Sequence, residues 1–91
     1  MAEPVIINST QIITTLQGGA MAYDLFYASN NETTFILHNG AQFLLGSTMV
    51  YVNNSYQSFT SYTEVNGVTI VFNSPVANGA VVEVRYIQPV I

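Results

Sequence analysis

Few side chains in this sequence could do chemistry, and they are widely separated. The five carboxylates stand singly along 91 residues, at Glu3, Asp24, Glu32, Glu64 and Glu83. A glycosidase needs two positioned carboxylates, and a zinc site needs three or four nitrogen, sulfur or oxygen ligands. The chain has one histidine, His38, and no cysteine. We therefore expect no catalytic residue, no metal site and no cofactor, and predict a protein that is not an enzyme.

Glu83 and Arg85 are the charged residues whose spacing suggests an interaction. They are two positions apart in an alternating segment, so they lie on the same face of a strand. An exposed ion pair would contribute no more than about 1 kcal/mol. Arg85 is also a candidate hydrogen-bond donor at a subunit interface, and the sequence leaves both interpretations open.

Six tyrosines and five phenylalanines are the largest resource for binding. Three of them, Tyr51, Tyr56 and Phe59, lie around the turn residues Asn53 and Asn54. Aromatic side chains at loop tips can fill a pocket on a partner or stack on a sugar. Packing in the core or in an interface is the alternative interpretation.

Composition restricts the partners that this chain can have. Hydrophobic residues make up 49% and charged residues 7%, against about a quarter charged in an average soluble domain. With a net charge of −4 and one Arg, the chain cannot neutralise several phosphates, so we expect no nucleic-acid binding. An uncharged polar surface suits symmetric contacts, which predicts a homo-oligomer. We find no signal peptide and no membrane span, and expect a soluble, unexported chain.

Short alternating segments separated by turn residues predict the elements that position these side chains. The clearest signal is the hairpin at Asn66-Gly67, between 62–65 and 68–72. Strand segments are expected at 33–37, 48–52, 55–59 and 81–87. The segment 20–27 fits both strand alternation and a helical face, and strand or irregular structure is favoured there. The pattern predicts an all-β fold, a small antiparallel β-sandwich of about seven short strands, immunoglobulin-like or related.

The predicted core residues follow from the same alternation. Phe35 is expected inside on its strand, and two later strands are expected to point Val68, Ile70, Phe72, Val82, Val84 and Tyr86 inward. Gly18-Gly19 is expected to end an earlier element, and Pro89 to end the last strand. We divide the chain into a β-rich arm, 1–27, and a β-sandwich module, 28–91.

Residues 31–88 resemble a known family. Met49-Val-Tyr-Val-Asn-Asn, Ser61-Tyr-Thr, Asn66-Gly-Val-Thr-Ile-Val-Phe, Ser74-Pro-Val-Ala-Asn-Gly and Val82-Glu-Val-Arg-Tyr-Ile occur in the order of a small β module. That module is found in tail-fibre and other virion structural proteins of tailed bacteriophages. Asn54, Ser61 and Ala80 depart from the family pattern, which usually has Gly, Asp and Asp there. Asn tolerates the positive φ of the turn.

The resemblance implies a non-enzymatic virion structural protein that assembles in the host cytoplasm. A capsid decoration or cement protein is the first hypothesis, with a major capsid protein or another virion protein as partner. A tail-associated adaptor or fibre module is the alternative. A carbohydrate-binding domain that reads a host-surface glycan is the third. The β-branched clusters of the arm are candidate partner-binding residues through strand addition: Val5, Ile6, Ile7, Ile12 and Ile13.

Overall fold

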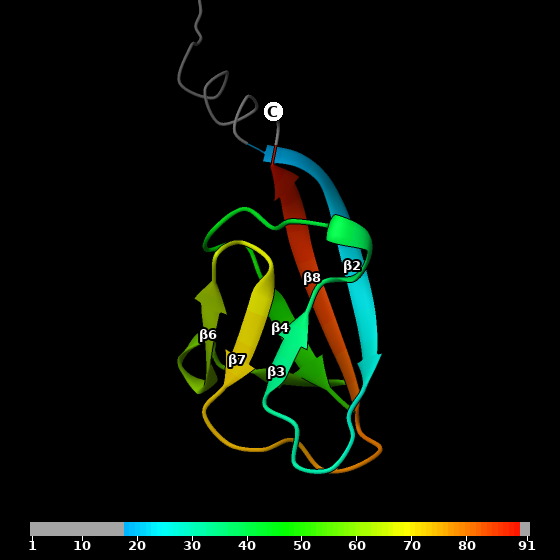
Figure 1. Cartoon of the computed structure of the whole chain (residues 1–91). Coiled ribbons are helices and arrows are strands. Elements are labelled where there is room, and N and C mark those ends of the chain that lie inside the picture. Colours follow the sequence, from blue (N-terminus) through cyan, green and yellow to red (C-terminus); the bar gives the residue numbers. More distant parts are fainter. Residues whose placement is uncertain (1–17, 90–91) are drawn as a thin grey trace, which may run out of the picture.

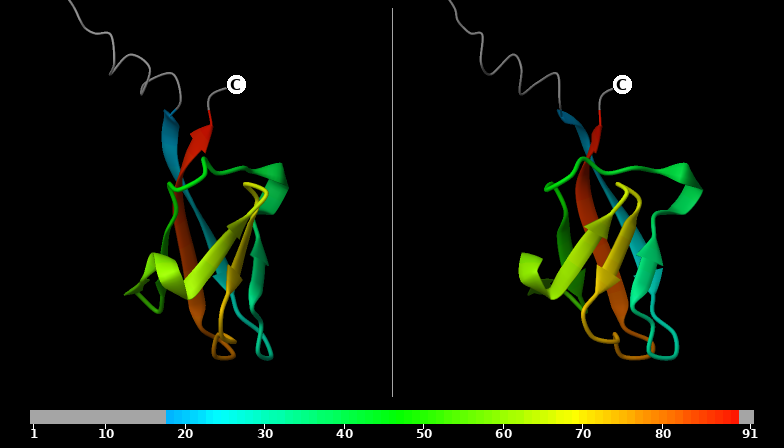
Figure 2. Two further views of the ribbon diagram at one scale, coloured as in Figure 1. Left: turned by 90° about the vertical axis from the view of Figure 1, so that its left-hand side faces the viewer. Right: turned by 60° about the vertical axis from the view of Figure 1, so that its left-hand side comes forward.

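The structure is a computed structural model that describes residues 18–89. Its strands form two antiparallel sheets, one with the order β2-β8-β4-β5 and one with the order β3-β7-β6. Figure 1 shows the smaller sheet in front of the larger one, and Figure 2 shows them as two layers face to face. The predicted all-β sandwich of about seven strands is therefore confirmed.

The larger sheet contains the two longest strands of the described chain. Its members are β2 (Gly18–Tyr27), β8 (Val81–Pro89), β4 (Met49–Val52) and β5 (Ser55–Gln57). The smaller sheet contains β3 (Thr34–Ile36), β7 (Thr69–Phe72) and β6 (Tyr62–Val65). Two short 3-10 turns, η1 (His38–Gly40) and η2 (Phe59–Ser61), lie in the connections between strands.

Two tight turns form because their residues accept positive φ. Asn53 and Asn54, at φ 48° and 69°, join β4 to β5 in the hairpin that the sequence predicts. Asn66 and Gly67, at φ 55° and 68°, join β6 to β7, and the amide of Val68 donates to the carbonyl of Val65. Both pairs suit a turn that keeps the twist of the flanking strands.

The core lies between the sheets and follows the predicted alternation. Phe35 is 2% exposed, and its ring meets those of Phe26 and Phe72 edge to face, with centroids 5.4 and 5.6 Å away. The β-branched side chains at its centre are fully buried, namely Val50, Ile70, Val82 and Val84. β4 buries Val50 in this core and places Met49 and Tyr51 on the opposite side of the larger sheet, so its two apolar faces meet different surroundings.

Three sequence predictions require correction at element ends. Gly18 and Gly19 begin β2 rather than ending an element, and β8 continues beyond the predicted 81–87 to Pro89, which ends it as expected. The strand expected over 55–59 ends at Gln57, because Ser58 starts a turn: its hydroxyl accepts from the amide of Thr60, and its carbonyl accepts from that of Ser61.

The boundary placed at residue 27 falls just after a strand that is integral to the larger sheet. β2 pairs with β8 from Gly18 opposite Pro89 to Tyr27 opposite Val81, so residues 18–27 belong to the sandwich. The β-branched clusters at 5–7 and 12–13 lie outside the described residues. Packing of that segment on a neighbour stays a prediction.

Candidate binding face of the larger sheet

The face of the larger sheet that points away from the core carries an unusual set of exposed side chains. We call this surface the outer face. Strand alternation places eleven residues on it: Met21, Tyr23, Leu25, Tyr27, Met49, Tyr51, Tyr56, Val81, Glu83, Arg85 and Ile87. Nine of the eleven are apolar or aromatic. An exposed surface of this kind marks an interaction site more often than a single exposed Leu does.

Strand register arranges these residues in rows across the sheet. One row runs from Leu25 through Glu83 and Tyr51 to Tyr56, and the next contains Tyr23, Arg85 and Met49. Residues directly opposite each other on neighbouring strands have side chains in contact range. The rows therefore form a continuous surface.

The two charges of the outer face neutralise each other. Nε of Arg85 donates to Oε2 of Glu83 over 2.6 Å, and this hydrogen bond raises the pKa of Arg85. The guanidinium carbon of Arg85 also lies 4.9 Å from the centre of the Tyr51 ring. Tyr51 in turn meets Tyr56 edge to face, with centroids 5.8 Å apart. The pair thus sits among aromatic rings with no net charge, an arrangement suited to an apolar or aromatic partner.

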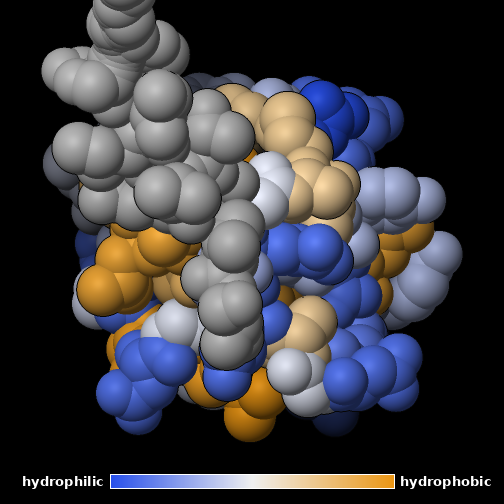
Figure 3. Space-filling view, turned by 90° about the horizontal axis from the view of Figure 1, so that it is seen from above, coloured by the Kyte–Doolittle hydropathy of each residue, from blue (hydrophilic) through white to orange (hydrophobic). Residues whose placement is uncertain are grey.

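The outer face contains a shallow hollow between β2 and β8. It has a volume of about 450 Å³ and is lined by Met21, Ala22, Tyr23, Leu25, Glu83 and Arg85. Tyr23 and Met21 are each 65% exposed at its rim. At the end of the sandwich where β2 begins and β8 ends, hydrophobic residues reach the surface between hydrophilic ones (Figure 3). The hollow can receive an apolar side chain from a partner.

The predicted partner-binding residues divide into three groups. Tyr51, Tyr56 and Arg85 come together on the outer face. Phe59 does not join them, because it lies in η2 and its ring packs on Tyr62, with centroids 5.4 Å apart. The remaining five lie outside the described residues: Val5, Ile6, Ile7, Ile12 and Ile13.

The exposed residues of β2 are the part of this surface that the sequence reasoning missed. Their signal was present as an alternation of large side chains at Met21, Tyr23, Leu25 and Tyr27. The same stretch also fits a helical face, and only its pairing with β8 decides for a strand. Long-range pairing can override such local ambiguity.

Asp24 and His38 connect the two sheets at one side of the sandwich. One carboxylate oxygen of Asp24 accepts from the backbone amide of His38, and the other lies 2.7 Å from Nδ1 of its ring. The imidazole stacks on Phe26 with centroids 4.8 Å apart. Within residues 18–89 no three His, Cys, Asp or Glu side chains group as metal ligands. The hydrogen bonds of Asp24 join β2 to the turn that follows β3.

Glu64 fixes the loop that precedes β4. Its carboxylate accepts from the amide of Gly46 over 2.7 Å and from the hydroxyl of Thr48 over 2.6 Å. The Thr48 hydroxyl also lies 3.1 Å from that of Tyr62, and Thr48 is 5% exposed. A buried hydroxyl is costly when it has no partner, so Glu64 stabilises this crossing between the sheets.

Removing the Glu64 carboxylate is expected to lower the free energy of unfolding. Glu64→Ala leaves the Thr48 hydroxyl and the Gly46 amide without their charged acceptor, which costs about 2–3 kcal/mol. Glu64→Gln keeps one acceptor oxygen and is expected to cost less. Urea denaturation followed by circular dichroism measures both. Equal losses in the two variants would show that the carboxylate oxygens do not hold the loop.

Tyr62 makes stability depend on pH in alkaline solution. Burial raises its pKa above the ordinary value near 10, although its hydrogen bond to Thr48 acts in the opposite direction. The neutral phenol is favoured in the fold, so its contribution is complete below pH 10 and declines as pH rises through the folded pKa. Thermal melting from about pH 8 to pH 11 should show this decline, and it should be shallower in Tyr62→Phe. Parallel profiles would contradict this role.

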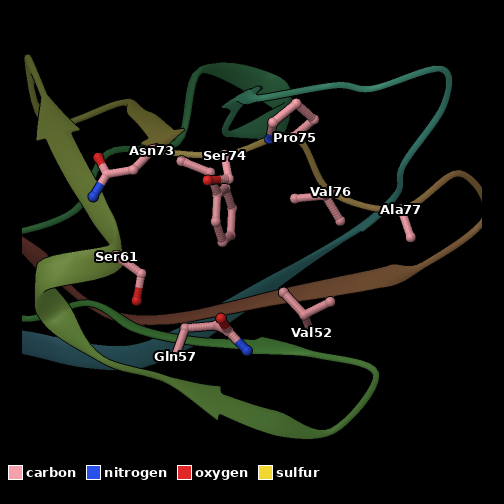
Figure 4. A pocket seen from close by; sticks show the side chains of 9 residues that line it. Val52, Gln57, Ser61, Asn73, Ser74, Pro75, Val76 and Ala77 are labelled. Carbon is pink, nitrogen blue, oxygen red and sulfur yellow. The ribbon is translucent and has the colours of Figure 1, made fainter.

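A second hollow lies between the two sheets beside β5 (Figure 4). It has a volume of about 470 Å³, with Val52 and Val76 on its apolar wall. The polar side chains at its rim are already engaged: the amide groups of Gln57 and Asn73 donate to the carbonyls of Ser55 and Thr60. These donors hold the protein's own loops, so the hollow is a weaker candidate than the outer face.

Comparison with known proteins finds no matching family model, no similar curated protein and no similar solved structure. Across residues 18–89, no helix has the length and apolar content needed to cross a membrane. The site is therefore interpreted from its own geometry.

Proposed function

We propose that this protein is a non-enzymatic structural protein of a bacteriophage particle, most simply a capsid decoration or cement protein. The observation that carries the proposal is the outer face, on which nine apolar or aromatic residues surround one neutralised ion pair. Through it the chain would dock on the major capsid protein or another virion protein. The virion setting is supported by the resemblance of residues 31–88 to phage tail-fibre and virion modules.

The chemistry of the outer face fits a protein partner. Interface centres are enriched in Tyr, Met and Arg and depleted of charge, and Arg85 between Tyr23 and Tyr51 reproduces that composition. Three of the described carboxylates are already engaged by groups of the chain itself: Asp24 and Glu64 in contacts between the sheets, and Glu83 in its ion pair with Arg85. This use of the described acids supports a role in binding rather than in catalysis.

A density map of the particle tests the proposal. We expect copies of the chain spread evenly over the shell, with the outer face against the underlying capsid protein. Copies clustered at one vertex would support the alternative of a tail-associated adaptor or fibre module. Density that places the outer face in solvent, or no copy on the particle, would contradict the docking surface.

Carbohydrate binding is the second candidate, because exposed tyrosine rings can stack on sugars. Tyr23, Tyr27 and Tyr56 are 65%, 73% and 59% exposed on the outer face. The rings would then read a host-surface glycan. Deleting residues 2–16 separates the hypotheses. A carbohydrate-binding domain would still bind its glycan after the deletion. A protein that attaches through an N-terminal arm would no longer join particles. Normal incorporation after the deletion would contradict the arm.

A further inference from the structure

The long strand β2 leaves one edge of its backbone without a strand partner within residues 18–89. It is the first strand in the order β2-β8-β4-β5, at the side of the larger sheet (Figure 1). Backbone groups of alternate residues point to opposite sides of an antiparallel strand. The amide of Ala28 points toward the chain segment just before β8 and donates to the carbonyl of Ala80, so the even-numbered residues direct their backbone groups toward β8. The amide of Leu25 instead donates to the carboxylate of Asp24. The backbone groups of the odd-numbered residues therefore point toward the free edge.

This edge lacks the usual protection against pairing. Natural edge strands are short, or contain Pro, Lys or a bulge near the exposed groups. β2 has ten residues with no Pro, Lys or Arg, and its irregularity lies at its start, between Gly18 and Met21. Its one charged residue is Asp24, whose carboxylate accepts from the amide of Leu25, so a partner strand would have to displace that single contact. At the opposite edge of the same sheet, β5 has only three residues and leads into η2. β2 is thus the edge of the larger sheet built for strand addition.

We propose that β2 pairs antiparallel with β2 of a second copy around a two-fold axis. The pairing would join two four-stranded sheets into one of eight strands. Two strands of ten residues match in length, and the exposed side chains of Tyr23, Leu25 and Tyr27 would meet equivalents that favour cross-strand contact. The proposal uses the edge and not the outer face, so it stands whether or not that face binds a virion protein.

Each chain has a net charge of −4, but the carboxylates near this edge already have hydrogen-bond partners, so two copies can approach each other there. The three acids near β2 are all bonded within their own copy. Asp24 accepts from the amides of Leu25 and His38, Glu32 accepts from the amide of Ser29, and Glu83 accepts from Arg85. Contact along the edge therefore brings together no described carboxylate that lacks a partner, and like-charge repulsion is small.

Cross-linking of single-cysteine variants tests the pairing, since the full chain has no cysteine of its own. Cysteine is placed in turn at Met21, Tyr23, Leu25 and Tyr27, and each variant is treated with a short bifunctional maleimide. Opposite and diagonal residues of an antiparallel pair lie within its reach. We expect covalent dimers to be strongest at one β2 position and weak for Tyr56→Cys on β5. Equal or stronger cross-linking at Tyr56 would overturn the proposal.

Sedimentation of the full chain supplies an independent measurement. Tyr23→Pro removes an amide from the free edge, where Pro is tolerated, whereas Tyr23→Ala keeps that amide. We expect a concentration-dependent dimer that Tyr23→Pro weakens about tenfold more than Tyr23→Ala, with native circular dichroism in both. A chain that stays monomeric up to about 1 mM would overturn the pairing. A β2 cross-link that forms only after deletion of residues 2–16 would also overturn the proposal, because that segment would then occupy the edge in the full chain.

Discussion

Replacing Phe35 with Ala is expected to lower the free energy of unfolding by about 3–5 kcal/mol. The ring is 2% exposed and lies between Phe26 and Phe72, one from each sheet. Its loss removes buried apolar contact and leaves a cavity between the layers. A domain of this size has a stability of only about 5–15 kcal/mol, so the variant should be largely destabilised. Urea denaturation followed by circular dichroism measures the change.

Ile36→Ala is the matched control, because Ile36 follows Phe35 on the same strand and is 60% exposed. Its truncation is expected to change stability by less than about 0.5 kcal/mol. A loss below about 1 kcal/mol for Phe35→Ala would show that the two sheets are not held together by this aromatic cluster. Comparable losses in both variants would contradict the burial pattern of β3.

Replacing both Tyr51 and Tyr56 with Ser is expected to reduce incorporation into particles by more than about tenfold. The two rings meet at the outer face, and Tyr51 also supports Arg85. Tyrosines at the centre of an interface commonly cost about 2 kcal/mol or more when truncated, and about 1.4 kcal/mol corresponds to tenfold in affinity. Copies per particle, measured by quantitative gel or mass spectrometry, report the effect.

Ile36→Ser serves as the control for this experiment as well, since it removes an exposed apolar side chain from the other sheet. It should leave incorporation unchanged. Circular dichroism must show that the double variant remains folded. Full incorporation of a folded Tyr51→Ser/Tyr56→Ser protein would rule out the outer face as the docking surface. Retained incorporation with lost glycan binding would favour the carbohydrate hypothesis.

Local signals in the sequence account for most of the described strands. Asn66-Gly67 and Asn53-Asn54 predict their turns because few other residues accept positive φ at such positions. The alternation around Val82 and Val84 predicts which face of the last strand is buried, because side chains point to opposite faces with a period of two. The ends of the strands were predicted less well, because hydrogen bonds decide where a strand begins and stops. Gly18 belongs to a strand through its pairing with the distant Pro89, and Ser58 ends a strand because its hydroxyl accepts from the nearby amide of Thr60.

A minority of the candidate site was predicted from the sequence. Tyr51, Tyr56 and Arg85 were predicted to bind a partner, and the register of β4 with β5 and β8 places them on one surface. Phe59 was predicted beside them, but its ring turns to Tyr62. Proximity along the chain does not determine which side of a sandwich a loop residue joins.

The sequence by itself determined the fold class, the hairpins and the near absence of charge, because these depend on residue type and on neighbours a few positions away. Only the tertiary structure decided that β2 pairs with β8, about sixty residues later in the chain. That long-range pairing exposes four large side chains beside Arg85 and leaves one strand edge open. Contacts between distant segments depend on the packing of the whole chain, which no local pattern encodes.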